Sequence, residues 1–396
     1  MDSKRAPIKT NLVSETATGQ YVILHVFPSF EIGGSQMRFA QLAHELGPTF
    51  HNKIISLSGN WDALKLVESL DNCDATPTPS MDAGIVERIS LIREQLKENP
   101  PDLLVTYNWG SIEYGLANLF FNLCPHIDIE DGFGPTEGKR RLFRRNLMRR
   151  IVYRRSAAVV VPSKTLSNIA QCEWGVKPCQ IHFIPNGINS SRFSSSQFNK
   201  DVKLATLKKY GIENTQIPVI GTIATLRKEK NIQRLIRAFN ICRKTQKANL
   251  VIVGSGPELE LLKQKAALSP YASSIIFTGH IARPEDIIGG FDLLALASDT
   301  EQMPLSVLES MAAGKTIVAV DVGDIKAMVS QSNQKYICHK NTAALAEGLN
   351  MALSDKAELK AIGEDNIRKV TSDYELKDMI HSYGQLFLNA INNKQS

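Results

Sequence analysis

The stretch Leu293-Leu-Ala-Leu-Ala-Ser-Asp-Thr-Glu-Gln-Met-Pro-Leu-Ser-Val-Leu-Glu-Ser-Met-Ala-Ala-Gly314 decides the fold. Its apolar beginning predicts a buried strand, and residues 298–303 predict a loop. Pro304 is expected as the first helical residue and Gly314 as the helix stop. The apolar run at 315–320 then predicts the next strand. A strand, loop, helix and strand in this order form the unit of a parallel α/β sheet, whose ligands bind at the carboxyl ends of the strands.

Two carboxylates stand on either side of the predicted helix start. Glu301 lies in the loop that follows the strand, and Glu309 lies more than one turn into the helix. Between them the free N–H groups of Leu305 and Ser306, together with the helix dipole, favour an anion. This layout suits a ligand made of a sugar, a diphosphate and a ribose. From the spacing alone, Glu301 could equally be an ordinary loop carboxylate and Glu309 a solvated helix residue, with no ligand bound to either.

In these residues the chain resembles the family 4 retaining glycosyltransferases, in which a Glu-x7-Glu pair follows a strand of the C-terminal domain. The small residues Ser310-Met-Ala-Ala-Gly314 match the helix end of that family. The resemblance implies that Glu301 contacts hydroxyls of the donor sugar, that the backbone after it binds the diphosphate, and that Glu309 binds the ribose hydroxyls. The diphosphate-binding positions would be Pro304, Leu305 and Ser306.

The domain organisation follows from the alternation of predicted strands and helices along the chain. This alternation predicts the α/β class with a parallel, doubly wound sheet. The resemblance implies two Rossmann-like domains that face each other across a cleft, the arrangement called GT-B. An acceptor-binding domain is expected at residues 1–189, completed by a C-terminal helix at 374–396, and a domain that binds the nucleotide sugar at 190–373. Serines near 190–196 indicate the linker.

The loop Ala224-Thr-Leu-Arg-Lys-Glu-Lys-Asn231 follows a predicted strand. Its Arg227, Lys228 and Lys230 therefore cluster at the carboxyl end of that strand. Such charge can neutralise a departing diphosphate. In the family an arginine and a lysine hold the diphosphate, and Lys230 matches the lysine. Thr225 occupies the usual arginine position, and Arg227 is the substitute two residues later. A run of surface charge is the alternative.

Two glycine turns lie on the same predicted rim. Gly254-Ser-Gly256 superficially resembles a dinucleotide fingerprint, but Leu259 replaces the third glycine, which argues against nicotinamide binding. The resemblance implies that Gly254 and Gly256 lie near the nucleotide base. Gly33 and Gly34 form the first turn, with Ser35 as the expected helix cap, and the resemblance implies that they face the donor across the cleft. An ordinary strand–helix turn is the alternative.

Asp131-Gly132 stands where the family often carries a His-Gly pair, with the histidine beside the donor sugar. A carboxylate can accept a hydroxyl proton but cannot donate like a neutral imidazole. We assign Asp131 to the cleft, and a role in fixing the turn is the alternative.

The segment Lys139–Arg155 holds nine Lys or Arg in seventeen residues and no acid. Phe143, Leu147 and Ile151 are four apart, with Leu142, Met148 and Val152 beside them, which predicts a helix whose apolar stripe packs on the sheet. Its charges are then expected to face anionic lipid or a polyprenyl-diphosphate-linked acceptor. A basic side that is merely solvated is the alternative. Nucleic acid is a poorer partner, because few aromatic residues interleave the charges.

Composition and short motifs indicate the cellular location and the need for a metal. The 396 residues are 43% hydrophobic with a net charge of +6, but no apolar run has the length of a signal peptide core or a membrane span. No Asp-x-Asp motif or close cysteine pair occurs. We therefore expect a cytoplasmic enzyme, peripheral at the inner face of the membrane, that needs no metal and no cofactor besides its nucleotide-sugar substrate.

The expected activity is that of a hexosyltransferase. It would move a sugar from a nucleotide sugar to a glycan or lipid-linked acceptor, with retention of anomeric configuration, in cell-envelope or exopolysaccharide synthesis. A nucleotide-sugar epimerase of the same architecture, which needs no acceptor, is the first alternative. A non-catalytic subunit that binds nucleotide sugar or glycan is the second, supported by Thr225 and Asp131 at positions where the family carries other residues.

Overall fold

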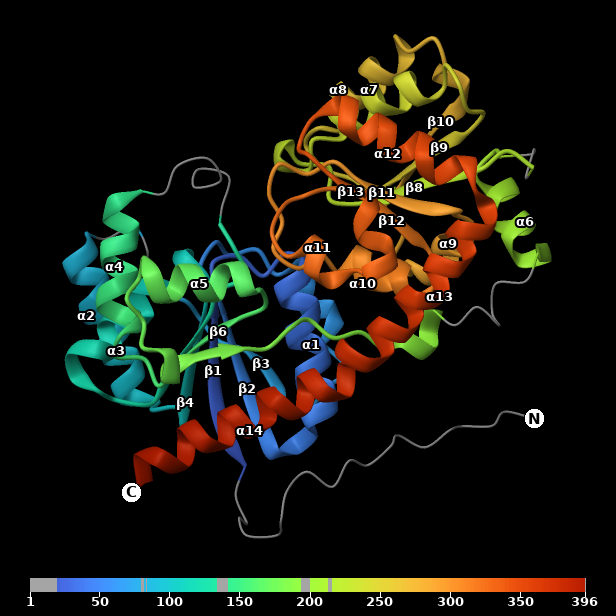
Figure 1. Ribbon diagram of the computed structural model, residues 1–396. Helices are drawn as coiled ribbons and strands as arrows, with labels where there is room; N and C mark the ends of the chain where they lie inside the picture. Colours follow the sequence, from blue (N-terminus) through green and yellow to red (C-terminus); the bar gives the residue numbers. More distant parts are fainter. Residues whose placement is uncertain are drawn as a thin grey trace.

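The computed structural model describes residues 20–79, 82, 84–133, 142–193, 200–212 and 216–395. Two parallel sheets, each with helices packed against it, form two adjacent parts of the molecule (Figure 1). We call the part built on the first sheet the first domain and the other the second domain. The predicted α/β class with two doubly wound sheets is confirmed. The expected bounds of the domains at 189 and 373 stay predictions.

The first sheet has the strand order β3-β2-β1-β4-β5-β6-β7, and β4 and β5 near its centre are buried along their whole length. Its strands are β1 (Tyr21–Phe27), β2 (Phe50–Ser56), β3 (Cys73–Ala75), β4 (Leu103–Tyr107), β5 (His126–Ile129), β6 (Ala158–Val161) and β7 (Ile181–Phe183). The helices that cover it are α1 (Gly34–Leu46), α2 (Ile85–Glu98), α3 (Ile112–Phe121), α4 (Phe143–Tyr153) and α5 (Lys164–Cys172). The strand order reverses between β1 and β4, and doubly wound sheets bind ligands in the crevice outside such a switch point.

The second sheet has the strand order β10-β9-β8-β11-β12-β13 and reverses between β8 and β11. Its strands are β8 (Val219–Ile223), β9 (Asn249–Val253), β10 (Ile275–Gly279), β11 (Leu293–Leu296), β12 (Thr316–Val320) and β13 (Ile337–Cys338). Its helices are α6 (Lys200–Lys209), α7 (Ile232–Cys242), α8 (Leu259–Ala267), α9 (Glu285–Ile288), α10 (Leu305–Ala312), α11 (Ile325–Met328), α12 (Thr342–Ser354) and α13 (Lys356–Asp373). This part also contains short 3-10 turns at Ser190–Phe193, Lys228–Lys230, Ala272–Ser274 and Gln331–Tyr336.

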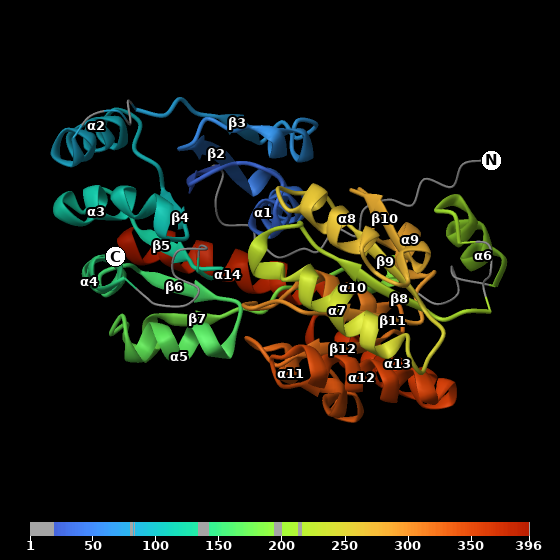
Figure 2. The ribbon, with the colours of Figure 1, turned by 90° about the horizontal axis from the view of Figure 1, so that it is seen from above.

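The last helix, α14 (Leu376–Gln395), returns from the second domain and lies along the first (Figures 1 and 2). Its Tyr383 and Phe387 are buried in the same core as β1 and α1. At the crossing, Ile188 forms a parallel bridge with Glu375. A Cβ on Gly187 would lie 2.8 Å from the carbonyl oxygen of Glu375, so the two crossing segments are in backbone contact.

Two expected helix starts differ from the structure. Ser35 does not cap α1, because the helix begins at Gly34 and extended Gly33 takes the cap position without a side-chain bond. Pro304 is also a cap residue rather than the first helical residue, since its ψ of 125° is extended and α10 begins at Leu305.

The prediction for the orientation of α4 is wrong for most of its apolar stripe, although Val152 is 1% exposed and Met148 packs against the same core. Phe143, Leu147 and Ile151 were expected to pack on the sheet, but they are 80%, 47% and 43% exposed. The inward side instead carries Arg149, which is fully buried beside the carboxylate of Glu130 at 2.8 Å. This buried ion pair fixes the rotation of the helix, because a guanidinium taken from its carboxylate would be left unpaired. Residues 139–141 of the basic segment lie outside the described part.

Candidate functional site

The loops after β8 and β11 meet at the carboxyl edge of the second sheet. These two strands are neighbours at the point where the strand order reverses, with Leu293 opposite Ile220. The crevice outside such a switch point is where doubly wound sheets bind ligands. The two loops carry most of the residues that the sequence singled out.

Glu301 and Lys230 form an ion pair between these loops. Lys230 Nζ donates to Glu301 Oε1 at 2.6 Å, and Ser298 Oγ donates to the same oxygen at 2.6 Å. The side chain of Glu301 is 8% exposed and that of Lys230 is 25% exposed, so the pair lies at the edge of the protein interior. Behind it, a Cβ on Gly323 would lie 2.1 Å from the carbonyl oxygen of Glu301. Lys230 and Ser298 therefore hold the carboxylate, while the backbone of Glu301 packs against the loop after β12.

The N-terminus of α10 follows directly and has no side-chain cap. Among the described residues, no acceptor takes a hydrogen bond from the N–H of Leu305 or Ser306. Free amides at a helix N-terminus and the helix dipole favour an anion. Glu301 and these amides thus lie along one short segment, and Lys230 reaches Glu301 from the loop after β8.

Glu309 lies one turn further along α10. Burial raises the pKa of its carboxyl group to about 7, although nearby Arg192 opposes the shift and the carboxylate of Glu285 adds to it. Arg192 Nη2 donates to Glu285 Oε1 at 2.6 Å, so the positive charge of Arg192 acts on Glu285 as well as on Glu309. Glu309 is therefore a carboxyl group that can change its protonation state near neutral pH.

Arg227 is not joined to the Glu301–Lys230 pair. Its Nη2 donates instead to Glu31 Oε1 at 2.6 Å, in the loop after β1 of the first domain. Both side chains are 45% exposed. Thr225 is exposed in the same loop as Arg227, and its carbonyl oxygen accepts from the N–H of Arg227 at 2.8 Å. Sequence reasoning missed Glu31, because nothing in the local pattern predicts a partner in the other domain.

Gly254 and Gly256 have a backbone reason to be glycine. A Cβ would lie 1.9 Å from the carbonyl oxygen of Ala224 in the first case and 2.6 Å from that of Leu226 in the second. Their φ angles of 137° and 155° also disfavour other residues. The two glycines let the loop after β9 pack on the loop that carries Lys230. Their contact with a nucleotide stays a prediction.

Gly33 and Gly34 differ, because the surrounding backbone does not require them. A Cβ on Gly33 would meet only the flexible side chain of Gln36, at 2.9 Å, and one on Gly34 would meet nothing within 4 Å. The space beside Gly34 is open, which leaves room for a ligand to approach the backbone there.

Asp131 forms a bidentate ion pair with Arg38 of α1. The guanidinium donates to the two carboxylate oxygens at 2.6 and 2.7 Å, and Arg38 is only 4% exposed. Arg38 also donates to Asn186 Oδ1 at 3.0 Å, and Asn186 donates to the carbonyl oxygen of Met303 at 2.9 Å. Asp131 is thus the end of a polar chain that reaches the loop after β11. Arg38 and Asn186 lie far from Asp131 along the chain, so local spacing does not predict these contacts.

A second contact joins the domains next to Glu301. Asp324 accepts from the N–H groups of Lys164 and Thr165, at 2.5 and 3.1 Å, and so caps α5 of the first domain. Ser163 Oγ donates to Gln302 Oε1 at 2.9 Å. The loop with Glu301 is therefore anchored to the first domain by its neighbouring residue.

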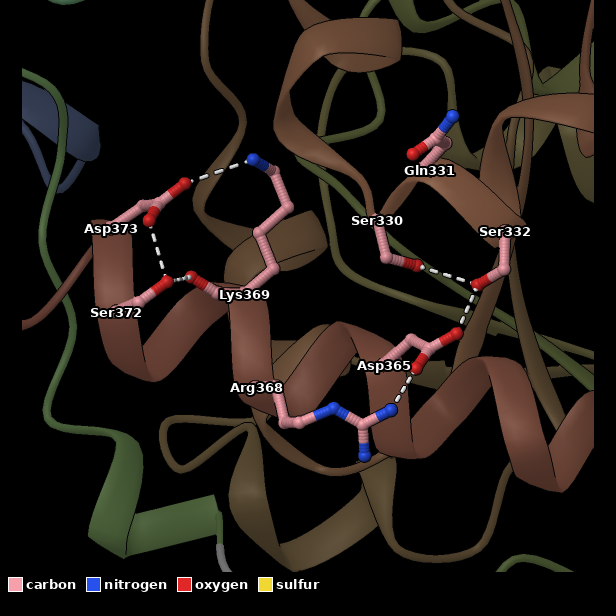
Figure 3. A pocket seen from close by; sticks show the side chains of 8 residues that line it. All are labelled: Ser330, Gln331, Ser332, Asp365, Arg368, Lys369, Ser372 and Asp373. Carbon is pink, nitrogen blue, oxygen red and sulfur yellow. Dashed lines mark hydrogen bonds and ion pairs between the residues drawn. The ribbon is translucent and has the colours of Figure 1, made fainter.

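A cavity of about 550 Å³ lies between the 3-10 turn at Gln331–Tyr336 and α13, and Figure 3 shows its polar lining. Its cations are paired within α13, Arg368 with Asp365 and Lys369 with Asp373, as the dashed lines mark. None of the sequence-predicted site residues lines it. We do not assign it a role in the site.

Two family models match the chain. Residues 32–192 match "Glycosyltransferase Family 4", and residues 205–370 match "Glycosyl transferases group 1". Together the two matches cover more than half of the chain.

Two curated relatives and one solved structure extend this comparison. N-acetyl-alpha-D-glucosaminyl L-malate synthase of Bacillus anthracis is 24% identical over 185 residues, which are 46% of this chain and 48% of that protein. Alpha-monoglucosyldiacylglycerol synthase of Streptococcus pneumoniae is 30% identical over 164 residues, which are 41% of this chain and 36% of that protein. The crystal structure of Anabaena Alr3699/HepE in complex with UDP superimposes with a TM-score of 0.78 at 17% identity, covering 93% of this chain and 99% of that one.

These matches cover different shares of the chains compared. The chain spans about half the length or less of the two curated relatives. The solved structure shares the fold across nearly the whole of both chains.

Proposed function

Because the chain belongs to the glycosyltransferases of family 4 and group 1, we propose that it transfers a hexose from a nucleotide sugar to a glycan or lipid-linked acceptor. Its fold is GT-B, with two Rossmann-like domains. The second domain holds the donor in this proposal, and the first domain holds the acceptor. The observation that carries the proposal is the Lys230–Glu301 ion pair at the switch point, beside the uncapped amides of α10.

Each polar group of the site receives a part in this reaction. Glu301 accepts hydrogen bonds from hydroxyls of the donor sugar and so fixes its orientation. The amides of Leu305 and Ser306 bind the diphosphate, and Lys230 neutralises the charge that grows on it as the bond to the sugar breaks. Glu309, once ionised, accepts from the ribose hydroxyls. Arg227 joins the diphosphate after it leaves Glu31.

We propose that the sugar keeps its anomeric configuration. In this mechanism the acceptor hydroxyl attacks from the face that the diphosphate leaves, and the leaving phosphate oxygen takes the hydroxyl proton. No protein nucleophile takes part. Positive side chains and helix amides stabilise the leaving group, so we propose that transfer needs no metal ion.

The donor and acceptor classes draw support from relatives. The similar structure of Alr3699/HepE was solved with UDP, which favours a nucleoside-diphosphate sugar as donor. One relative is named for a glucosylated diacylglycerol, which favours a lipid-linked acceptor and a role in the cell envelope. We place the enzyme in the cytoplasm at the inner face of the membrane, where both substrates meet. Among the described helices, none is both long and apolar enough to span a bilayer.

The test of this proposal is the variant Glu301→Ala. It is expected to abolish donor turnover while leaving the fold intact, because Glu301 orients the sugar and lies in the loop after β11 rather than in a strand or helix. Glu260→Ala is the matched control, since Glu260 is 76% exposed on α8 and has no part in the site. Turnover would be measured as nucleotide release, and folding by circular dichroism. Wild-type turnover in Glu301→Ala would remove the proposal.

A further inference from the structure

The outer side of α4 carries a continuous apolar row. Phe143, Leu147 and Ile151 are 80%, 47% and 43% exposed, and Leu142 just before the helix is 44% exposed. Residues four apart lie on one side of a helix, so the three side chains form a single row along it. An exposed row of this kind indicates a surface that meets an apolar partner.

Four exposed arginines stand beside this row: Arg144, Arg150, Arg154 and Arg155. No carboxylate of the described residues forms an ion pair with any of them. The segment 142–155 also contains no acidic residue. The positive charge on this side of α4 is therefore free to meet an external anion.

The helix is locked in this orientation. Arg149 lies on the opposite side, fully buried, 2.8 Å from Glu130 and with its guanidinium 5.2 Å from the ring of Trp109 and 5.1 Å from that of Trp174. Tyr153 adds a hydrogen bond of 2.7 Å to the same carboxylate. Turning α4 to bury the apolar row would break these contacts and leave the buried charge of Glu130 without its partner. The exposed row is thus a stable feature of the fold.

We propose that this side of α4, the apolar row with its four arginines, docks on a bilayer that contains anionic phospholipid. The row enters the boundary between headgroups and acyl chains, and the arginines meet the phosphate charges around it. Charge complementarity selects this occupant, because an apolar partner alone would leave the four cations unmatched. In both views α4 lies on the side of the first domain away from the second (Figures 1 and 2). Docking there leaves the Glu301–Lys230 pair accessible to a donor.

The test uses the full chain and vesicle flotation, with phosphatidylcholine vesicles with and without phosphatidylglycerol. Binding is expected only with phosphatidylglycerol and is expected to fall as salt rises. Phe143→Ser with Leu147→Ser is expected to lower the partition coefficient about tenfold or more, because both side chains lose their burial in the bilayer. Each arginine changed to glutamine, at 144, 150, 154 or 155, is expected to cost roughly fivefold.

Matched controls lie on the second domain. Leu268→Ser removes a side chain that is 83% exposed, close to the value for Phe143. Arg237→Gln with Lys247→Gln removes two exposed cations. These controls are expected to bind vesicles like the wild type. Circular dichroism checks that all variants fold.

Three outcomes would overturn the proposal. The first is no binding to anionic vesicles, and the second is binding that the α4 variants leave unchanged. The third is self-association of the wild type that Phe143→Ser abolishes, which would make the row an interface between two copies. Flotation needs neither donor nor acceptor. Its result is therefore independent of whether the chain transfers a sugar.

Discussion

Lys230 Nζ lies 2.6 Å from Glu301 Oε1, so a cation from the loop after β8 and a carboxylate from the loop after β11 form one ion pair at the switch point of the second sheet. The residues are 71 positions apart in the chain. Their meeting follows from the parallel order of the two strands. In the unliganded protein each group neutralises the other, and a bound donor would replace both partners, with hydroxyls at the carboxylate and diphosphate at the cation.

Replacement of Lys230 by methionine is expected to lower kcat by about 100-fold or more. The side chain keeps its length but loses the charge that stabilises the leaving diphosphate. Lys228→Met is the control, because Lys228 is exposed in the same 3-10 turn and makes no ion pair with a described residue. Steady-state nucleotide release measures both. Equal losses in the two variants would show that general charge, and not Lys230, matters.

Glu31→Gln is expected to raise the affinity for a nucleoside diphosphate by up to about fivefold. The exposed Glu31–Arg227 pair competes with the ligand for Arg227, and such pairs contribute at most about 1 kcal/mol. Arg227→Gln is expected to lower the affinity and to make it insensitive to residue 31. Calorimetric titration with the free nucleotides measures both. Unchanged affinity in both single variants would place Arg227 outside the phosphate site.

Asp131→Ala is expected to destabilise the protein by about 3 kcal/mol or more. Arg38 is 4% exposed and would lose both of its carboxylate contacts, which leaves a buried charge unpaired. Urea unfolding gives the free energy, and the double variant Arg38→Met, Asp131→Leu is expected to recover part of it. A fully stable Asp131→Ala variant without activity would instead assign Asp131 to the reaction alone.

Stability is expected to fall as pH rises from about 4.5 to 7 through Glu309. Burial raises the pKa of this carboxyl group from 4.5 to about 7, so in this window the folded state holds a proton that the unfolded state has lost. Unfolding free energy then decreases with pH, by at most about 1.4 kcal/mol per unit. Below about 4.5 both states are protonated and this contribution is constant.

The matched variant Glu309→Gln removes this titration. The difference in unfolding free energy between Glu309→Gln and the wild type is expected to grow between pH 5 and about 7. Donor affinity is expected to move the other way, rising with pH in the wild type, because only the ionised carboxylate accepts two ribose hydroxyls. A constant difference across the window would contradict the account of Glu309.

The unit at residues 293–320 was predictable because its signals are local. An apolar run, a proline and a glycine specify a strand, a helix start and a helix end, and β11, α10 and β12 lie where these signals place them. Lys230 and Glu301 could be brought together because each follows a buried strand of one parallel sheet. Only the position of Pro304, one residue before the helix, differs.

The partners of the site residues were not predictable in this way. Arg38 holds Asp131 from 93 positions away, and Glu31 holds Arg227 from 196 positions away. The orientation of α4 failed for the same reason. Periodicity favours burial of its apolar stripe. The rotation of the helix is instead set by the buried ion pair of Arg149 with Glu130, which lies in another segment. Contacts between distant segments leave no trace in local spacing.

The most direct measurement of the central claim is time-resolved NMR of the purified protein with UDP-, GDP- and ADP-sugars, with and without a crude extract of lipid-linked acceptors. We predict that one nucleotide is released only when acceptor is present, and that the new glycosidic bond has the anomeric configuration of the donor. An altered sugar still joined to its nucleotide would identify an epimerase. Saturable binding that leaves every donor unchanged would identify a binding subunit, and either result would contradict sugar transfer.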